Sequence, residues 1–361
     1  MSPSIELSPE QRHMYASERL INFRWISKIL ATRSPRILND DDLTSPDLHL
    51  ELATLGQFSE LVYCPFPLEF AFNNLALLLS PGFPLEGYDA LNTSDFVRSF
   101  HGSVANLSGF IVRRQKTEQL VVAISGTSSI WQAAYTIRAH QVAHSVGSGC
   151  KVHSGFWSLY LGIRSQVFDA IRESLEGHII GELVITGHSM GGAMSYLLAF
   201  DILNSDEIQI TRGLKLKIVT FGAPRCGNEA LVQCWRSLVD GCRTEYGRGS
   251  VQEYCVKGYN DGVPSLPPLK LGYRHFSQNP LYYVHGRLYH IPESESECAL
   301  FDSHSEIKDI PTHPRGGHNY YNGRDMEKAA RRMWWLKEVH KEEGWEQLYR
   351  KRMEQEQKRK I

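Results

Sequence analysis

The chain has 361 residues, with 39 Lys and Arg against 40 Asp and Glu, and a formal net charge of −1. Hydrophobic residues make up 42% and aromatic residues 11% of the sequence, which excludes a disordered protein and allows a large core. The balanced charge gives no electrostatic footprint for nucleic acid, so we expect no nucleic-acid partner.

The cysteines and the N-terminal sequence indicate in which cellular compartment the protein is expected. Seven cysteines are scattered without zinc-ligand spacing or a recognisable disulfide framework. The sequence up to His13 lacks the charged and apolar regions of a secretory signal. No stretch has the roughly 18 consecutive apolar residues that a membrane-spanning helix needs. These features predict a cytoplasmic protein with free thiols.

The first fifty residues predict an N-terminal helical extension. Ser8 to Gln11 form a capping box with proline at the first helical position. Apolar residues follow at helical spacing: Met14, Ile21, Trp25 and Ile29. We interpret this segment as an amphipathic helix packed on the domain, and a membrane-surface helix is the alternative. Residues 34–50 are polar and rich in aspartate, which predicts a loop.

The rest of the chain alternates between helical and strand patterns. Helices are predicted at 50–63, 66–79, 154–175, 190–204, 227–238 and 326–343. Strands are predicted as a pair within 107–125, and at 182–186, 216–221, 252–258 and 281–291. This alternation predicts an α/β fold with a mostly parallel central sheet and helices on both faces. Residues 326–361 are predicted to form a C-terminal helix and a charged tail. We expect the tail to be solvated or a frayed helix, and binding to an anionic membrane surface is the alternative.

One serine stands in a special position. The stretch G-H-S-M-G, from Gly187 to Gly191, follows a strand pattern and precedes a helix of small residues. In this context a G-x-S-x-G pattern predicts a sharp turn that lifts the Ser189 hydroxyl to the carboxyl edge of the sheet. The amides of the next helix would point to the same place. Ser189 is therefore the predicted nucleophile, and a helix-capping serine between glycines is the alternative.

Six blocks in chain order resemble the fungal-type class 3 lipases of the α/β-hydrolase fold. The blocks are A-I-S-G-T-S-S-I at 123–130, V-H-S-G-F at 152–156, G-H-S-M-G-G at 187–192, V-T-F-G-A-P-R-C-G-N at 219–228, N-D-G-V-P-S-L-P-P at 260–268 and G-H-N-Y-Y at 317–321. The resemblance covers about residues 55–325, so we place a lipase-like α/β-hydrolase domain at 51–325, between the N-terminal extension (1–50) and the C-terminal segment (326–361).

The resemblance implies partners for the serine, which needs a base and an acid to act as a nucleophile. It implies Asp261 as the acid and His318 as the base, with the backbone amides of Thr127 and Met190 as the oxyanion hole. Asp261 directly follows the predicted strand 252–258, where sites of this architecture form. A turn aspartate is the alternative for Asp261. The rival histidines are His285, His290 and His313.

The segment from Ser128 to His144 occupies the family's lid position. Its apolar helical face would consist of Ile130, Trp131, Ala134 and Ile137. A mobile lid and a fixed core helix both fit this pattern. Many relatives carry Asp or Asn nine residues after the oxyanion residue, whereas this chain has Thr136. The sequence H-Q-V-A-H at 140–144 lacks the glutamate of a zinc hydrolase, so we expect no metal and no cofactor.

The resemblance implies a serine carboxylic ester hydrolase that cleaves acylglycerols through a Ser-His-Asp triad and an acyl-enzyme intermediate. The implied partner is a lipid or other ester substrate at a membrane or lipid-droplet surface. The alternatives are a phospholipase, an esterase for small soluble aromatic esters, and a lipid-binding module without catalysis. Acyl-chain length, positional preference and oligomeric state stay open at this stage.

Overall fold

A central eight-stranded sheet organises the molecule. The computed structural model describes residues 9–16, 22–104, 107–126, 140–303 and 316–358. The strands lie in the order β13-β12-β10-β8-β7-β4-β3-β2. Their bounds are β2 (Asp95–His101), β3 (Ser108–Arg114), β4 (Gln119–Ile124), β7 (Glu182–His188), β8 (Lys215–Phe221), β10 (Val251–Gly258), β12 (Pro280–Val284) and β13 (Arg287–His290). Neighbours from β4 to β12 pair in parallel, and the outer strands pair antiparallel.

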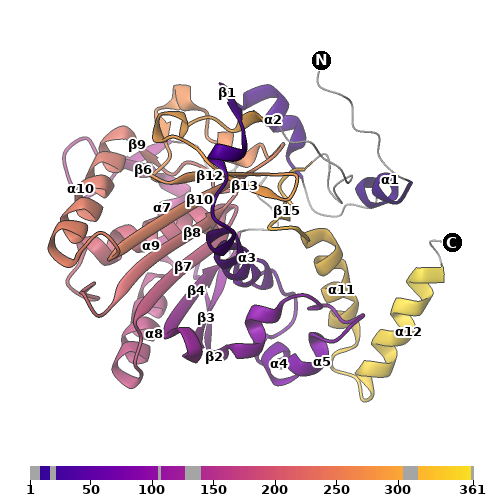
Figure 1. The fold of residues 1–361 in the computed structure, drawn as a ribbon. Coiled ribbons are helices and arrows are strands. Elements are labelled where there is room, and N and C mark those ends of the chain that lie inside the picture. The colour runs from indigo at the N-terminus through magenta and orange to yellow at the C-terminus, as the bar shows by residue number, and fades with distance from the viewer. Residues whose placement is uncertain (1–8, 17–21, 105–106, 127–139, 304–315, 359–361) are drawn as a thin grey trace.

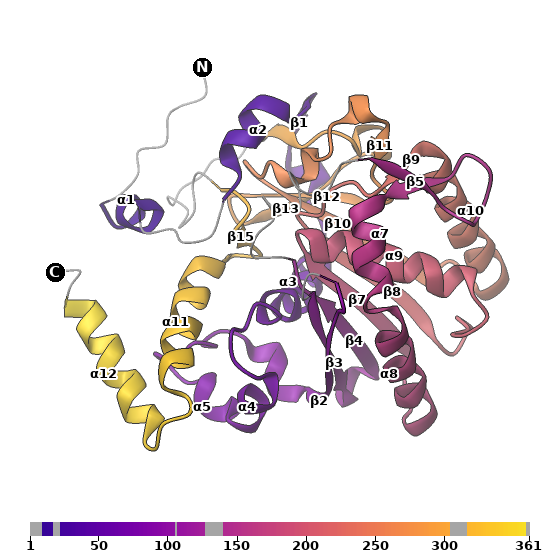
Figure 2. The ribbon, with the colours of Figure 1, turned by 180° about the vertical axis from the view of Figure 1, so that it is seen from behind.

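Helices cover both faces of this sheet (Figures 1 and 2). One apolar cluster lies between the sheet and α7 (Ser154–Leu161), α8 (Arg164–Gly177), α9 (Met190–Asn204) and α10 (Glu229–Tyr246). A second cluster lies between the sheet and α3 (Pro46–Leu61), α4 (Leu68–Asn73), α5 (Leu75–Leu78), α11 (Met326–Val339) and α12 (Trp345–Lys358). The predicted α/β fold, with a mostly parallel sheet and helices on both faces, is confirmed.

Strand β4, in the interior of the sheet, has apolar side chains at every position from Leu120 to Ile124. Leu120, Val122 and Ile124 contribute to the first cluster. Val121 and Ala123 point the opposite way and contribute to the second. Because successive side chains of a strand alternate between faces, a sheet covered on both sides needs apolar residues at every position.

The region predicted as a loop at 34–50 contains regular structure, so that prediction is wrong. β1 (Arg33–Leu38) pairs in parallel with β14 (Leu300–Ser303), and α3 already begins at Pro46. Arg33 and Asp302 form an ion pair across the two short strands. A polar strand whose partner lies more than 250 residues away leaves no local periodicity, so the pattern of residues 34–50 could not show it.

The N-terminal extension contains two short helices, α1 (Pro9–Ala16) and α2 (Arg24–Leu30). Phe23 and Ile26 are buried against Val263, so this segment packs on the domain through residues that the helical spacing did not select. Trp25 and Ile29, which the spacing placed on the packed face, are 47% and 70% exposed. The chain enters α2 through Phe23 at a φ of 58°, which changes the register of the helical faces.

Three predicted elements are each divided in two. The helix predicted at 66–79 is α4 and α5, which are separated at Asn74. The helix predicted at 154–175 is interrupted at Gly162 and Ile163 between α7 and α8. The strand predicted at 281–291 is the hairpin of β12 and β13, which turns at His285 and Gly286 with positive φ at both residues. Such a tight turn needs two residues with positive φ, and the sequence marks it only by one glycine.

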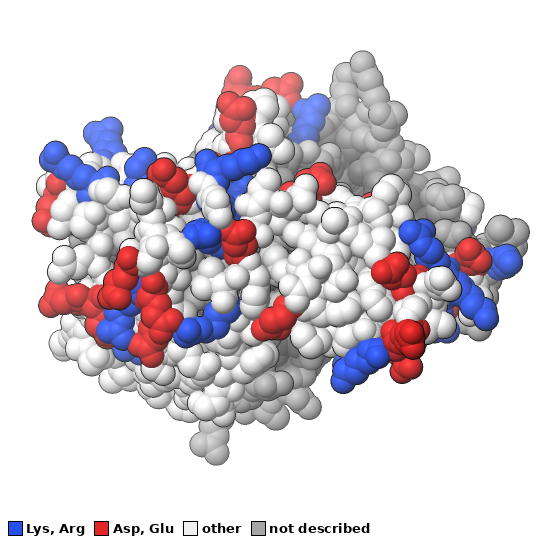
Figure 3. Space-filling view, turned by 90° about the horizontal axis from the view of Figure 1, so that it is seen from below, with Lys and Arg blue, Asp and Glu red and all other residues white. Residues whose placement is uncertain are grey.

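Smaller sheets complete the fold around the carboxyl end of the central sheet. One has the order β11-β9-β6-β5 and consists of β5 (Gln141–Ala143), β6 (Lys151–His153), β9 (Gly227–Asn228) and β11 (Tyr273–Arg274). Another is the hairpin of β15 (Tyr320–Tyr321) and β16 (Arg324–Asp325). Over the described ranges, no helix is long and apolar enough to cross a membrane. On the face in Figure 3, acidic and basic side chains lie next to one another.

Candidate active site

Ser189 lies in a strained turn between β7 and α9. Its φ is 62° and its ψ is −133°, a conformation that non-glycine residues adopt only when their surroundings impose it. The turn is tight because strand and helix approach closely at two glycines. A Cβ atom on Gly187 would lie 2.4 Å from the backbone of Gly191, and one on Gly191 would lie 2.0 Å from the Ile124 carbonyl oxygen. The two glycines are therefore steric requirements of the turn that presents Ser189.

Asp261 and His318 form a buried hydrogen-bonded pair. Asp261 lies three residues beyond the end of β10, at the carboxyl edge of the sheet. The Nδ1 atom of His318 lies 2.9 Å from Oδ2 of Asp261, and the other carboxylate oxygen accepts the amide of Val263 at 2.8 Å. Both side chains are almost completely buried. Since the carboxylate accepts from Nδ1–H, Nε2 of the neutral imidazole is left as the acceptor.

Tyr321 is a second partner of the carboxylate, and its role was not predicted from the sequence. Its hydroxyl donates to Oδ2 of Asp261 at 2.5 Å and accepts the amide of Gly258 at 2.9 Å. Burial, and then the charge of Asp261, raise the pKa of Tyr321 well above its ordinary value, so the phenol stays protonated as a donor. The only sequence signal was its place three residues after His318, in the block G-H-N-Y-Y.

The two atoms that would react are buried and unpartnered. Among the described residues, neither Oγ of Ser189 nor Nε2 of His318 has a hydrogen-bond partner. Ser189 directly follows His188, whose Nε2–H donates to the His318 carbonyl oxygen at 2.8 Å and whose ring centroid lies 4.3 Å from that of His318. Buried polar atoms in proteins are nearly always paired, so each unpaired one needs an explanation, and a catalytic role is one such explanation. A serine hydroxyl and the acceptor nitrogen of a carboxylate-bound imidazole are the two groups that nucleophilic catalysis by serine requires.

His188 links three segments of the site. Its Nδ1 accepts from the Tyr63 hydroxyl at 3.0 Å, and that hydroxyl accepts the amide of Gly126 at 3.2 Å. Burial, and then the nearby His318, lower the pKa of His188 well below its ordinary value, so the ring is neutral. The chain of bonds connects the turn after β4, the serine turn and the loop of His318. Neither Tyr63 nor His188 was selected from the sequence.

Residues 22–24, at the start of α2, contact the loop that carries His318. The carbonyl oxygen of Asn22 accepts the His318 amide at 3.0 Å, and the ring of Phe23 contacts the imidazole edge-on at 5.3 Å between centroids. Nε of Arg24 donates to the Gly316 carbonyl oxygen at 2.8 Å. These contacts fix the backbone on both sides of Gly317, whose φ of 114° only glycine adopts readily.

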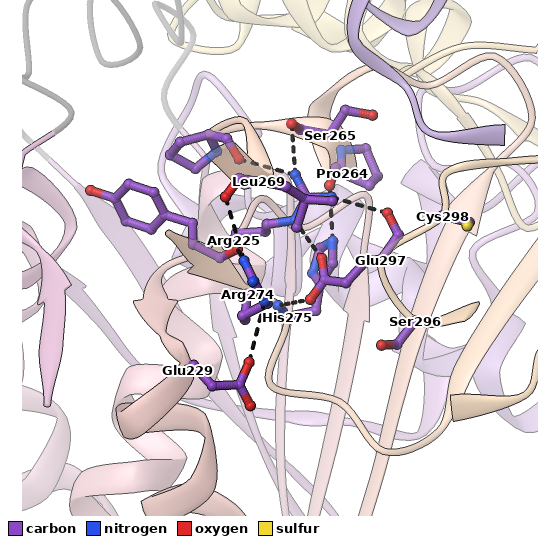
Figure 4. Close-up of polar contacts among 12 residues, drawn as sticks. Arg225, Glu229, Pro264, Ser265, Leu269, Arg274, His275, Ser296, Glu297 and Cys298 are labelled. Carbon is purple, nitrogen blue, oxygen red and sulfur yellow. Dashed lines mark hydrogen bonds and ion pairs between the residues drawn. The ribbon is translucent and has the colours of Figure 1, made fainter. Parts of the chain in front are cut away.

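Arg225 holds the loop that follows Asp261 (Figure 4). Its guanidinium is 2% exposed and donates to two carbonyl oxygens of residues 265–267, at 2.7 and 3.0 Å. Nε of Arg225 also pairs with the Glu297 carboxylate at 2.6 Å. That carboxylate accepts the amide of His275, whose Nε2 in turn lies 2.8 Å from the Pro264 carbonyl oxygen. The acid loop is thus bound to two other segments of the chain.

Several residues selected from the sequence lie outside the described residues. They are Thr127 and Thr136, the lid face of Ile130, Trp131, Ala134 and Ile137, and the rival His313.

Met190 and the other rival histidines are described. Met190 is the first residue of α9, where a backbone amide has no intrahelical acceptor and can bind an oxyanion. His285 lies in the β12–β13 turn with its ring against Tyr259, and His290 is exposed at the end of β13. Neither rival is bonded to Asp261 in the described contacts. Within the same ranges, no group of three or more His, Cys, Asp or Glu could hold a metal ion.

Comparisons with known proteins fit this geometry. Residues 121–271 match the family model described as lipase (class 3). A lipase from Rhizopus niveus is 27% identical over 180 residues, and a secreted mono- and diacylglycerol lipase from Fusarium solani is 26% identical over 190 residues. These matches cover 50% and 53% of this chain and 42% and 51% of the relatives. The chain thus spans about half the length of the curated relatives it matches.

Solved structures show the same architecture. Lipase II from Rhizopus niveus superposes with a TM-score of 0.59 at 20% identity, over 80% of this chain and 98% of that one. The fold is therefore the α/β-hydrolase fold.

The prediction of a cytoplasmic protein is contradicted, because the similar lipases of Fusarium solani and Penicillium cyclopium are secreted. That prediction relied on unpaired cysteines and on the first residues of the chain. Neither feature fixes a compartment, because scattered cysteines can pair through the fold and the N-terminal sequence alone does not identify every route of export.

Proposed function

We propose that this protein is a serine carboxylic ester hydrolase acting on acylglycerols. Its residues 121–271 match the model of the class 3 lipases, which supports the proposal. The observation that carries the proposal is that Oγ of Ser189 and Nε2 of His318 are buried and unpartnered, while Nδ1 of the same imidazole is bonded to Asp261. The relatives named as mono- and diacylglycerol lipases favour acylglycerols as the substrate class and an extracellular place of action.

The reaction follows from the placement of these groups. Nε2 of His318 takes the proton of the Ser189 hydroxyl as Oγ attacks the ester carbonyl, and the amide of Met190 stabilises the oxyanion that forms. His318 then protonates the leaving alcohol, and an acyl-enzyme remains. Water, deprotonated by the same imidazole, releases the fatty acid. Asp261 stabilises the transient imidazolium, and Tyr321 fixes the orientation of that carboxylate.

Ser189 has no exposed surface, so we expect substrate to reach it only after a conformational change. This burial favours a lipase that becomes active at a lipid surface over an esterase for small soluble esters. A series of glycerol esters with increasing chain length, assayed below and above the concentration at which they form an interface, separates the two. We expect the rate to rise sharply when the interface forms. Equal specific rates on both sides of that concentration would favour the soluble-ester alternative.

Phospholipids are the remaining alternative substrate class. Mixed micelles that contain diacylglycerol and phosphatidylcholine at equal surface density present both esters to the same enzyme. We expect release of fatty acid from diacylglycerol to be faster, as the names of the relatives suggest. Faster release from phosphatidylcholine would replace the acylglycerol in the proposal by a phospholipid.

Replacing the nucleophile tests the chemistry itself. Ser189→Ala removes Oγ and should reduce ester hydrolysis by at least about 10³-fold, down to the residual rate of binding and oxyanion stabilisation. Ser195→Ala is the matched control, because Ser195 lies on the same helix and its hydroxyl only bonds the carbonyl oxygen of Gly191. The control should keep most of the activity. Wild-type turnover in the Ser189 variant would exclude the mechanism.

A further inference from the structure

Two cysteines that are distant in the sequence meet where the β5–β6 hairpin packs on α10. Cys150 directly precedes β6, and Cys234 lies in the second turn of α10. Their Sγ atoms are 3.3 Å apart and 84 residues separate them in the chain. All seven cysteines are free thiols in the structure. Two thiols this close can form a disulfide only if the backbone holds the two Sγ atoms near each other.

Asn228 fixes the backbone next to Cys150 to the helix that carries Cys234. This residue caps the helix that carries Cys234. Its Oδ1 accepts the amide of Lys151 at 2.9 Å, and its Nδ2 donates to the carbonyl oxygen of Gly149 at 2.8 Å. The two bonds flank Cys150, so the backbone on each side of that residue is fixed to the start of α10. The contact between the thiols is therefore built into the packing of the hairpin on the helix.

We propose that Cys150 and Cys234 form a covalent modification site that closes into an intramolecular disulfide when the protein meets a small disulfide oxidant such as oxidised glutathione. The bonded sulfur atoms of a disulfide are about 2.0 Å apart, so the two thiols have to approach by only about 1.3 Å. The site lies outside the residues proposed for ester hydrolysis, and it can be tested without measuring that activity.

The reaction proceeds by two exchanges. Cys234 is partly exposed and Cys150 is buried, so Cys234 meets the oxidant first. Its thiolate attacks one sulfur of oxidised glutathione, forms a mixed disulfide and releases one glutathione thiolate. The Cys150 thiolate then attacks Sγ of Cys234 and releases the second. Two protein thiols lose two electrons in total, oxidised glutathione gains them, and the two protons pass to the two glutathione molecules.

The environment of Cys150 sets the speed of the second exchange. Burial, and then the contact with Cys234, raise the pKa of Cys150 to about 11. Only a small fraction of this thiol is therefore ionised near neutral pH, and the thiolate is the attacking species. We expect closure to accelerate about tenfold for each pH unit between 7 and 9, as the thiolate fraction grows.

The full chain, reduced and then incubated with a mixture of oxidised and reduced glutathione at pH 8, tests the proposal. After alkylation of the remaining thiols, mass spectrometry should find the Cys150 and Cys234 peptides joined, with two hydrogens lost. Cys242→Ser is the matched control, because Cys242 lies on the same helix and contacts Ser250. That variant should form the same link, and Cys234→Ser should form none. Alkylated Cys150 together with free or glutathione-bound Cys234 in the wild type would overturn the proposal.

The consequence for stability gives a second measurement. A disulfide that closes an 84-residue loop without distorting the hairpin should raise the thermal midpoint by about 5 °C, and dithiothreitol should reverse the shift. Cys242→Ser should show the same shift, and Cys150→Ser should show none. A bond that forms but lowers the midpoint would contradict the claim that the native packing already accommodates it.

Discussion

At the scale of single residues, the geometry around the Asp261 carboxylate depends on a glycine. Gly222 has a φ of 59°, and its backbone passes directly beside the acid. A Cβ atom at this position would lie 2.6 Å from Oδ2 of Asp261 and 2.8 Å from the Tyr321 hydroxyl. Both distances are shorter than real Cβ contacts allow, and φ itself is unfavourable for alanine. A side chain here would therefore displace the acid and its tyrosine partner.

We predict that Gly222→Ala lowers kcat/KM for ester hydrolysis by about 100-fold, because a shift of about 1 Å in a catalytic group has that effect. Gly241→Ala is the control, since Gly241 lies in α10 and a methyl group there would have nothing within 4 Å. That substitution should leave kcat/KM unchanged and stabilise the helix by about 0.5–1 kcal/mol. Equal kcat/KM values for Gly222→Ala and the wild type would show that Asp261 tolerates displacement.

Site residues could be predicted from the sequence where neighbouring positions determine their role. They could not be predicted where the role depends on residues far away in the chain. Ser189 could be selected because two glycines, a strand and a helix surround it within a few positions. The Tyr321 hydroxyl acquires its role only because Asp261, 60 residues away, lies within 2.5 Å. Apart from its place in the block G-H-N-Y-Y, this tyrosine carries no sign of such a contact in the sequence.

At the scale of elements, Arg225 anchors the loop that follows Asp261, and a second arginine nearby provides a comparison. Arg225 is buried, and its pair with Glu297 is only partly accessible to water. Arg274 pairs with Glu229 at 3.2 Å, but both of these side chains are substantially exposed. Water screens the exposed pair, whereas the loss of a buried guanidinium leaves carbonyl oxygens and a carboxylate without donors.

We predict that Arg225→Met lowers the free energy of unfolding by about 3 kcal/mol, at the low end for a broken buried pair because Glu297 keeps some access to water. Arg274→Met should lower it by less than about 1 kcal/mol. Urea unfolding at pH 7 measures both values. Similar losses for the two variants would mean that Arg225 does not act as an anchor.

A buried carboxylate connects β10 with α10. Glu253 has no exposed surface, accepts from Nε1 of Trp235 at 3.2 Å and accepts the amide of Gln278 at 3.0 Å. Burial outweighs these two bonds and raises the pKa of Glu253 from 4.5 to about 7. Between these two values the folded protein holds a proton that the unfolded chain has released. The contribution of Glu253 to stability is therefore complete below about pH 4.5 and is lost as the pH rises through about 7.

We predict that Glu253→Gln, which cannot ionise, gains stability relative to the wild type as the pH rises from 4.5 to 8. The relative gain should reach on the order of 3 kcal/mol. Urea unfolding of both proteins at a series of pH values gives this difference directly. Curves that stay parallel over the whole range would show that Glu253 does not titrate differently in the folded state.

The elements could be predicted wherever packing repeats along the chain. Strands β7 and β8 are buried on both faces and contain apolar stretches close to the predicted ranges. Strand β1 could not be predicted, because its hydrogen bonds go to β14 and its side chains are mostly exposed. The division between α7 and α8 was missed for a related reason, since the apolar spacing continues across the break.

At the scale of the whole molecule, segments outside the family match complete the domain. The C-terminal residues were expected to be solvated, yet Tyr349 of α12 is buried and its ring stacks on Phe83 at 5.2 Å. At the other end of the chain, Asn22 and Phe23 contact His318. The charged composition of the tail gave no indication of these contacts. A few buried rings are enough to pack such a helix against the domain. The domain boundaries at residues 50 and 325 stay predictions.

The most direct test of the central claim is labelling of the full chain with an alkyl phosphonate that reacts with activated serines. The reaction is run in the presence of lipid micelles, because Ser189 is buried in the structure. We predict a single adduct, located on Ser189 by peptide mapping, and a much slower reaction in His318→Ala. An adduct on another serine, or none under conditions in which the protein hydrolyses esters, would contradict the proposed site.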